Sequence, residues 1–241
     1  MCGRFLQFWF DETIISSLGV KGYPHNFTPS YNIAPTQKAW IILDDGAPRL
    51  EAFSWGLVPS WAKDTQGGSR LINARSETAA EKPSFRSAFT TRRCLVPANG
   101  FYEWTGTTGG KQPHFCTATP KAMMAFAGLW EKWQPANTEE RNTPVSAHYS
   151  FTILTREASP SFASIHHRMP VILSPRAYVQ WLNPQKTNPG QLKEILETRY
   201  LGEMETYPVS KAVNSPSHNG PDCMEPITLP GMEKPIQQSL F

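Results

Sequence analysis

The sequence has 241 residues, of which 39% are hydrophobic, so it can bury the core of one domain or at most two. Its formal net charge of +3 permits contact with a polyanion without demanding one, so a nucleic-acid interaction must be argued from local arrangements of residues. Residues 5–10 are too few for a signal sequence or a membrane span, and we expect a reduced, cytoplasmic protein. Its cysteines form no Cys-x-x-Cys pair and no cluster with histidine, which argues against zinc and a disulfide framework; they are Cys2, Cys94, Cys116 and Cys223.

The chain begins Met1-Cys2-Gly3-Arg4, and a cysteine at position 2 is small enough for methionine aminopeptidase to remove Met1. Removal leaves an amine and a thiol on neighbouring carbons, and the amine, with a reference pKa of about 7.7–8.0, is partly unprotonated near neutral pH. The amine can form a Schiff base with an aldehyde, on which the thiol can close a thiazolidine ring. Alternatively the thiol attacks a carbonyl with its own amine as base. Position alone favours a Cys2 that has no chemical role, so the rest of the sequence must supply the argument.

Short elements follow in order. Residues 11–18 predict a helix that Asp11 caps and Gly19 ends, and residues 21–35 predict a loop. Residues 40–43 and the stretch ending at residue 55 predict a hairpin around an Asp-Asp-Gly turn. Trp55 and Trp61 then surround Gly and Pro, which suggests aromatic rings displayed on a loop. The plainer interpretation is that both cover an edge of the core.

Residues 71–78 place a polar Asn-x-Arg-x-Glu pattern after two apolar residues, which predicts a strand that enters a helix. In one interpretation Asn73 caps that helix and Arg75 is a surface charge. In the other, Asn73 donates a hydrogen bond to a substrate oxygen and Arg75 binds a phosphate. Phe85 and Phe89 lie four residues apart and predict a short helix with both rings turned inward.

Residues 94–98 predict a buried strand, and residues 101–104 predict another in which Glu103 alternates with aromatic residues. If Glu103 is buried among these rings, its pKa should be raised, which suits a general acid or base. The same spacing also fits a solvated glutamate on the outer face of a strand. Residues 123–130 predict a central apolar strand, and residues 131–147 a surface loop.

A strand predicted at residues 150–155 leads to Ile165-His166-His167-Arg168-Met169-Pro170. Adjacent histidines on an extended segment point to opposite sides, which disfavours a metal site. One histidine that shuttles a proton, with Arg168 on a phosphate, fits better. Helices are predicted at residues 175–182 and 191–200, and a polar loop at residues 214–222.

Seven stretches together resemble the SRAP family, the SOS response-associated peptidases, which are also described as abasic-site processing proteins. They occur in family order and span the chain from Cys2 to about Pro226. The stretches are Met1-Cys2-Gly3-Arg4, Tyr31-Asn32-Ile33-Ala34-Pro35, Trp55-Gly56-Leu57-Val58-Pro59, Asn73-Ala74-Arg75, Phe101-Tyr102-Glu103-Trp104, Ile165-His166-His167-Arg168-Met169-Pro170 and Pro208-Val209-Ser210.

The pattern of strands and helices predicts an α+β fold, mainly antiparallel, with a barrel-like or two-sheet core and short helices around it. The barrel-like closure is an implication of the resemblance alone. The resemblance further implies an SRAP domain over residues 1–228 and a tail over residues 229–241. We expect a monomer without cofactor or metal.

In proteins similar to this one, the trimmed N-terminal cysteine forms a stable thiazolidine with the aldehyde of an abasic site in single-stranded DNA. The resemblance therefore implies that Cys2 is the double nucleophile, Asn73 positions the reacting centre and Glu103 transfers protons in Schiff-base chemistry and its reversal. It implies that His166 protonates the sugar ring oxygen. The expected DNA contacts are phosphates held by Arg4, Arg75 and Arg168, and bases stacked on Trp55 and Trp61.

Two other functions stay open. The family is also described as thiol peptidases that act on their own amino terminus, and a non-covalent single-strand binding module is the third possibility. The last five residues, Gln237-Gln238-Ser239-Leu240-Phe241, resemble peptides with which bacterial proteins dock on the replicative sliding clamp. Gln237, Leu240 and Phe241 are the expected contacts there, and the alternative is a chain end without a partner. Both partners, DNA and clamp, place the protein at the nucleoid.

Overall fold

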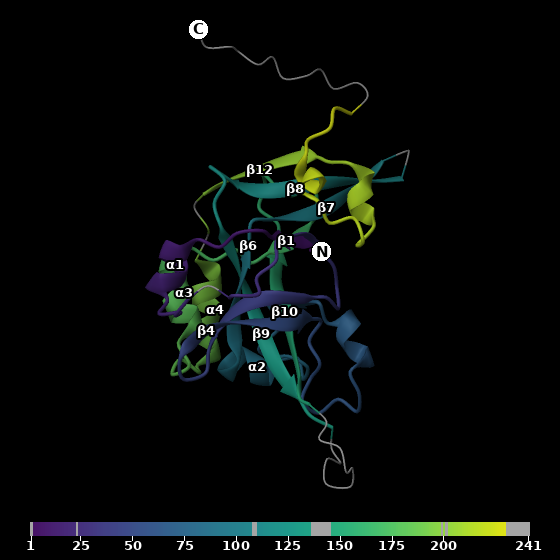
Figure 1. Ribbon diagram of the computed structural model, residues 1–241. Helices are drawn as coiled ribbons and strands as arrows, with labels where there is room; N and C mark the ends of the chain where they lie inside the picture. Colours follow the sequence, from purple (N-terminus) through teal and green to yellow (C-terminus); the bar gives the residue numbers. More distant parts are fainter. Residues whose placement is uncertain are drawn as a thin grey trace.

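The computed structural model describes residues 2–22, 24–107, 110–135, 146–198, 200 and 202–229. Its strands form two β-layers, one above the other in Figure 1. The upper layer is an antiparallel sheet of five strands in the order β12-β8-β7-β1-β2. These strands are β1 (Phe5–Gln7), β2 (Ser30–Ile33), β7 (Gly100–Thr107), β8 (Gly110–Thr119) and β12 (Glu203–Pro208).

The lower layer is a closed ring of five strands, because β10 pairs with β4 on one side and with β9 on the other. The ring consists of β3 (Lys38–Asp44), β4 (Pro48–Trp55), β6 (Arg93–Ala98), β9 (Met124–Trp133) and β10 (His148–Glu157). Two short strands, β5 (Asn73–Arg75) and β11 (Arg168–Pro170), pair with the carboxyl-terminal half of β10. The expected α+β fold with a barrel-like core is confirmed.

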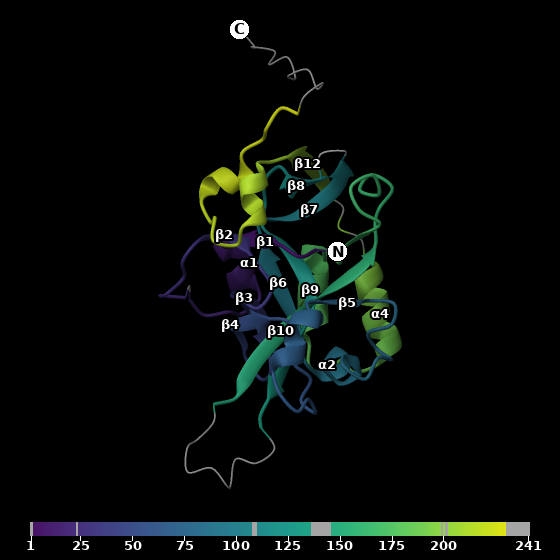
Figure 2. The same cartoon turned by 90° about the vertical axis from the view of Figure 1, so that its right-hand side faces the viewer.

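In the described part of the chain, four short helices pack on the outside of the barrel; all four are labelled in Figure 1, and Figure 2 shows α2 and α4 from the side. They are α1 (Glu12–Ser17), α2 (Arg86–Thr91), α3 (Pro175–Leu182) and α4 (Pro189–Glu197). Three single-turn 3₁₀ helices are η1 (Gln66–Arg70), η2 (Lys211–Asn214) and η3 (Pro221–Met224). Among the described residues, no helix is long and apolar enough to cross a membrane.

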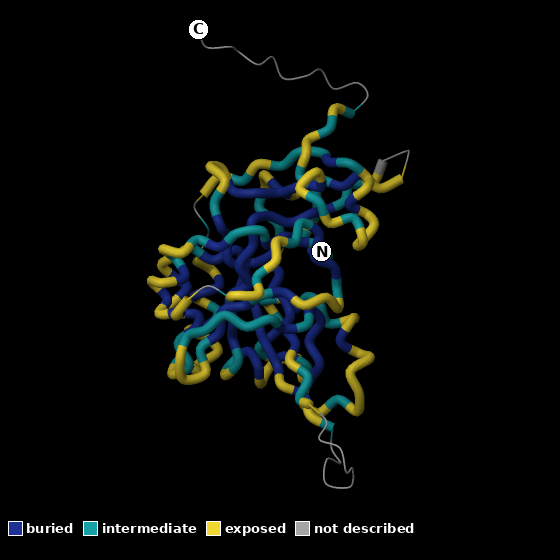
Figure 3. The backbone as a smooth tube through the Cα atoms, viewed as in Figure 1, coloured by how far each residue is buried: buried dark blue, intermediate teal, exposed yellow. Residues whose placement is uncertain are grey.

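The side chains of the barrel strands belong to two core clusters, because successive side chains of each strand point to opposite faces of the sheet. One cluster contains every second residue of the ring strands, together with Cys2 and Phe5 from the start of the chain. The other cluster contains the intervening residues and the apolar faces of the helices, for example Ile42 and Leu95 with Phe89 and Trp181. Figure 3 shows the buried backbone concentrated in the strands and the exposed backbone in the connections.

Local signals predicted several elements correctly. The carboxylate of Asp11 accepts hydrogen bonds from the N–H groups of Thr13 and Ile14 and so caps α1. The β3–β4 hairpin, the strands around residues 94–98 and 101–104, and helices α2, α3 and α4 also occur where the patterns placed them, with shifts of a few residues at their ends.

Other predictions were wrong where pairing is long-range. The predicted loop at residues 21–35 contains β2, which pairs with β1. Asn73 lies within β5, and α2 begins only at Arg86, so Asn73 does not cap a helix. β9 continues to Trp133, into the segment predicted as loop. Residues 136–145 and 230–241 lie outside the described residues, and with them the tail contacts Gln237, Leu240 and Phe241.

Candidate functional site

Cys2 lies inside the protein, fully buried just before β1. The N–H of Tyr102 donates to the carbonyl of Arg4 at 2.9 Å, and Phe5 pairs with Phe101, so the start of the chain runs antiparallel to β7. Burial raises the pKa of the Cys2 thiol well above its ordinary value, and the negative charge of Glu103 raises it further. At neutral pH the thiol is therefore protonated.

Glu103 lies on β7 with 3% of its surface exposed, so the alternative of a solvated glutamate is wrong. Burial raises the pKa of its carboxyl group. The influence of Glu103 on the Cys2 thiol places the two groups within electrostatic reach of each other. A carboxyl group with a raised pKa keeps its proton more readily than an ordinary carboxyl group, which suits a group that gives and accepts protons during a reaction.

Asn73 is brought to Cys2 from the barrel. Its Nδ2 donates to the carbonyl oxygen of Cys2 at 2.7 Å, across 71 positions of sequence. The backbone of Asn73 is fixed because β5 pairs in parallel with β10, Asn73 opposite Ile153. The Oδ1 of Asn73 is buried and has no hydrogen-bond partner among the described residues. The amide therefore anchors the N-terminal segment and offers a free acceptor oxygen next to it.

His166 lies in the turn that precedes β11. The backbone of Arg168 contacts the Nδ1 of His166 with both its groups: its N–H donates at 2.9 Å, and its carbonyl oxygen lies at 3.1 Å. When the neutral ring carries its proton on Nε2, Nδ1 accepts from this N–H, and when Nδ1 carries a proton it can donate to the carbonyl oxygen. Burial lowers the pKa of His166.

The two histidines do not point to opposite sides, contrary to the expectation from the sequence. Their rings stack, with centroids 4.3 Å apart and planes inclined by 25°. The reason is that His166 belongs to a helical turn, in which its N–H bonds to the carbonyl of Phe162, and not to an extended segment. The structure therefore brings Cys2, Asn73, Glu103 and His166 around the start of the chain, from four separate parts of the sequence.

Of the three arginines expected on phosphates, two hold other partners. Arg4 donates to Oδ1 of Asn32 at 2.6 Å and to the carbonyls of Val213 and Asn214 at 2.8 and 3.2 Å. Arg168 forms a bidentate ion pair with Glu77. Arg75 is exposed, and its side chain makes no hydrogen bond or ion pair within the described part of the chain.

Trp55 and Trp61 differ in the burial of their side chains. Trp55 is fully buried, and its indole N–H donates to the carbonyl of Ile72 at 2.9 Å. Its ring packs edge-on against Phe5 with a centroid distance of 4.9 Å. Trp55 therefore has no face to offer a base, and the expectation of stacking there is wrong. Trp61 is 66% exposed and keeps its ring accessible.

Sequence reasoning missed Asn32, which is buried and holds the carboxyl-terminal segment against β2. Its Nδ2 donates to the carbonyls of Val213, Ser215 and His218 at 3.1, 3.0 and 2.7 Å. The same side chain accepts from Arg4, so Asn32 joins this segment to the residues that follow Cys2. Its position inside the Tyr31–Pro35 stretch was the available signal, but only the fold supplies its partners.

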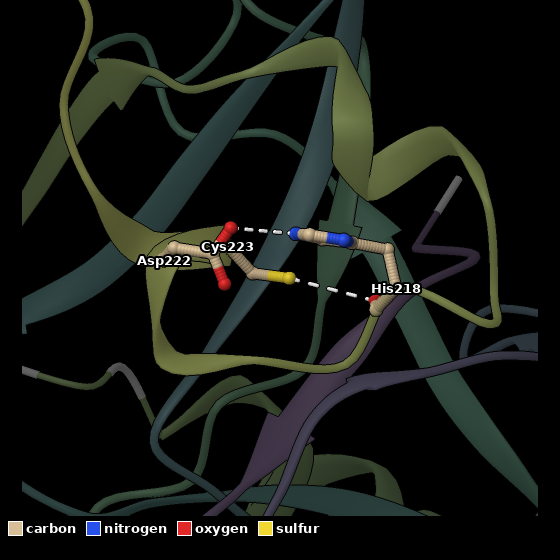
Figure 4. Close-up of side chains that lie close together, drawn as sticks. All are labelled: His218, Asp222 and Cys223. Atoms are coloured by element: carbon tan, nitrogen blue, oxygen red, sulfur yellow. Dashed lines mark hydrogen bonds and ion pairs between the residues drawn. The ribbon is translucent and has the colours of Figure 1, made fainter.

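The structure brings Cys223 close to a histidine, which the sequence had not suggested. Ligand atoms of His218, Asp222 and Cys223 lie within 4.8 Å of one another (Figure 4). However, Nε2 of His218 and Oδ2 of Asp222 are 2.6 Å apart as a hydrogen-bonded pair, and the Cys223 thiol donates to the carbonyl of His218 at 3.6 Å. Zinc ligands about 2.0–2.2 Å from a tetrahedral ion lie roughly 3.3 Å apart. These side chains therefore close a turn and do not fit a zinc ion as they stand.

Comparison with known proteins identifies the family. The model of the family described as "SOS response associated peptidase (SRAP)" matches residues 1–216. "Abasic site processing protein YoqW" of Bacillus subtilis (strain 168) is 42% identical over 229 residues, which cover 93% of this chain and 99% of the relative. "Abasic site processing protein HMCES" of Gallus gallus is 31% identical over 243 residues, covering 88% of this chain and 70% of the relative.

A crystal structure of a protein from Bacteroides thetaiotaomicron superposes with a TM-score of 0.81 at 24% identity, covering 94% of this chain and all of the other. At this level of identity the likeness shows the fold alone. The family match over most of the chain and the relatives above 30% identity show more: this chain belongs to the SRAP family.

Proposed function

We propose that this protein processes abasic sites in single-stranded DNA, and that Cys2, freed by removal of Met1, forms a thiazolidine with the aldehyde of the lesion. The family and the names of the relatives support abasic-site processing. The observation that carries the chemical proposal is the hydrogen bond from Asn73 to the Cys2 carbonyl, beside the buried carboxyl group of Glu103.

The first step is opening of the abasic sugar. A proton from Nε2 of His166 reaches the ring oxygen as the hemiacetal C1′–O bond breaks, and C1′ becomes an aldehyde carbon when its hydroxyl proton is lost. The lowered pKa of His166 makes its protonated ring a stronger acid than an ordinary imidazolium. Arg168 stabilises that protonated ring through its backbone carbonyl at Nδ1.

The second step joins the protein to C1′. The neutral α-amine of Cys2 attacks the aldehyde carbon, a C–N bond forms, and the aldehyde oxygen leaves as water after it has received protons. Glu103 is the proton donor, because its raised pKa favours the neutral carboxyl group. Asn73 fixes the attacking residue through its carbonyl group, and alignment of this kind is worth several orders of magnitude in rate.

The third step closes the ring. The Cys2 sulfur adds to the carbon of the C=N bond, and the thiol proton ends on the ring nitrogen through Glu103. The overall change is a condensation that releases one water and needs no oxidant or reductant. The neutral thiol that burial favours matches this route, because the thiol proton is needed on nitrogen at the end.

DNA contacts in this proposal come from two accessible side chains, those of Arg75 and Trp61. Arg75 follows Asn73 by two positions on β5, where its exposed guanidinium can reach a phosphate. Trp61 offers an exposed ring for a base, and stacking of this kind contributes about 1–3 kcal/mol. Arg4 and Arg168 act instead through the protein contacts described above.

A denaturing gel of the protein with single-stranded DNA that carries one abasic site tests the proposal, without any reductant that traps imines. Intact mass of the protein is measured in parallel. We expect a band that survives denaturation, requires protein without Met1, and is lost in Cys2→Ala. Cys116→Ala is the matched control, because Cys116 is a buried cysteine of the same core cluster. If protein without Met1 gives no such band, the thiazolidine proposal fails.

The same samples separate the two alternatives. A thiol peptidase cleaves peptides in a Cys2-dependent manner without attachment to DNA, although a protonated Cys2 thiol disfavours thiolate attack. A non-covalent binding module retains intact and abasic DNA equally, with a steep dependence on salt and no need for Cys2.

We also propose that the last five residues dock this protein on the sliding clamp, with the apolar side chains of Leu240 and Phe241 entering a pocket. The support is the sequence of the tail alone. A chain without residues 237–241 should lose clamp pull-down and keep its reaction with abasic DNA. Unchanged pull-down by the shortened chain contradicts the docking.

A further inference from the structure

The bidentate ion pair between Glu77 and Arg168 joins two segments 91 positions apart in sequence. The two guanidinium nitrogens of Arg168 donate to the two carboxylate oxygens of Glu77 at 2.7 and 2.9 Å. The Arg168 side chain is 12% exposed and that of Glu77 is 48% exposed. A planar fork of this kind fixes direction as well as distance, which a lysine in its place cannot do.

The pair lies across strand β10. Thr155 of β10 pairs with Arg75 of β5 on one side and with Pro170 of β11 on the other. The guanidinium of Arg168 also donates to the carbonyl of Thr155 at 2.6 Å, and this carbonyl accepts the N–H of Ser76 at 2.9 Å. Arg168 therefore reaches from β11 over β10 to the segment that follows β5.

Each end of the pair is next to a residue of the proposed site. Glu77 follows Asn73 by four positions, and Asn73 binds the Cys2 carbonyl. The backbone of Arg168 contacts Nδ1 of His166 with both its N–H and its carbonyl oxygen. A shift of Arg168 thus moves His166, and a shift of Glu77 moves the end of β5.

We propose that Glu77 and Arg168 are positioning residues that hold Asn73 and His166 at a fixed separation on the two sides of β10. This inference rests on the proposed function, because it assigns a role in the same reaction. In this proposal the guanidinium of Arg168 acts through its ion pair with Glu77 and does not bind a phosphate. Displacements of about 1 Å are enough to slow a reaction on the order of 100-fold.

Glu77→Gln tests the pair, because it keeps the shape of the side chain and removes its charge. Two quantities are measured on the full chain: affinity for intact single-stranded DNA, and the rate of covalent product at saturating abasic DNA. We expect unchanged affinity and a rate lowered on the order of 10-fold or more, with an altered dependence of the rate on pH because His166 is displaced.

Glu81→Gln is the matched control. Glu81 lies in the same segment and pairs with a cation of another element, Lys193, but it is 69% exposed and has no contact with His166 or Asn73. We expect neither quantity to change. Arg168→Lys tests the pair from its other end and should lower the rate without lowering the affinity, since the charge is retained.

Three results would overturn the inference. Tighter binding of intact DNA by Glu77→Gln would mean that Glu77 competes with phosphate for Arg168. Lower affinity in Arg168→Lys would mean that Arg168 binds DNA directly. Unchanged rate and affinity in both variants would mean that the pair has no role in the reaction. Failure of the proposed function is distinct from all three, because then the unchanged protein itself forms no covalent product.

Discussion

The burial of Trp55 and the exposure of Trp61 can be tested directly, because the sequence patterns led to the same expectation for both residues. Trp55→Phe keeps an aromatic ring in the core but removes the indole N–H that bonds to the carbonyl of Ile72. A buried acceptor without its partner costs about 1–3 kcal/mol, and the smaller ring leaves a void that costs about 1 kcal/mol more. We expect the free energy of unfolding to fall by about 2–4 kcal/mol.

Trp61→Ala is the control, since removal of a side chain that is 66% exposed should change the free energy of unfolding by about 0.5 kcal/mol or less. Urea unfolding followed by circular dichroism measures both variants, because fluorescence is itself altered by loss of a tryptophan. For a chain of this size, the loss in Trp55→Phe corresponds to roughly 4–16 °C in Tm.

For DNA affinity, Trp61→Ala should have the larger effect and Trp55→Phe the smaller one. Trp61→Ala should weaken binding to intact single-stranded DNA by about 1–3 kcal/mol, roughly 5- to 150-fold, and folded Trp55→Phe should bind as the unchanged protein does. If Trp55→Phe is as stable as the unchanged protein, or if it weakens DNA binding more than Trp61→Ala does, the assignment of Trp55 to the core is refuted.

Three further predictions follow from the site. Burial raises the pKa of Glu103, so its neutral carboxyl group favours the folded state. This stabilisation is fully present below about pH 4.3, the ordinary pKa of glutamate, and is lost as the pH rises through the raised pKa of the folded state. Glu103→Gln should therefore raise the Tm near pH 8 and leave it unchanged near pH 4. The same variant should lower the rate of covalent product by about 10²–10⁴-fold; a stabilised variant with full activity would contradict the role of Glu103. Asn73→Ala removes the hydrogen bond to the Cys2 carbonyl and should slow formation of the covalent product on the order of 10²-fold, measured in a quenched time course. The free energy of unfolding should fall by only about 1–2 kcal/mol. An unchanged rate would exclude anchoring by Asn73. Arg4→Ala leaves the buried Oδ1 of Asn32 without its donor and should lower the free energy of urea unfolding by about 1–3 kcal/mol. A loss of DNA affinity without a loss of stability would instead favour a contact between Arg4 and a phosphate.

The chemistry of the site depends on protonation states that burial sets. A free cysteine at the surface would react as a thiolate, whereas the buried Cys2 thiol keeps its proton. In the proposed reaction the α-amine is therefore the first nucleophile and the thiol the second. A protonated thiol is also a poor nucleophile for the alternative peptidase reaction until a proton acceptor such as Glu103 is ionised.

The amino-acid sequence by itself singled out the side chains to which we assign the proposed chemistry. Cys2, Asn73, Glu103 and His166 stand in short stretches whose residue types suggest a nucleophile, an amide donor, a carboxyl group among aromatic rings and a proton shuttle. Local signals also placed the capped helix α1 and the β3–β4 hairpin, because capping and turn geometry depend on a few neighbouring residues.

Only the tertiary structure decided the burial and the partners of these residues. β1 and β2 have no local signal, since three or four residues become strands only through pairing with distant ones. The same holds for side chains: Trp55 is buried because Phe5 and Phe151 cover it, whereas Trp61, six positions later, is left in solvent. Arg168 has its carboxylate partner 91 positions away, and no pattern along the chain encodes such a distance. Contacts of this range form only when the chain folds, which is why the sequence could suggest candidate residues and only the fold set their environment.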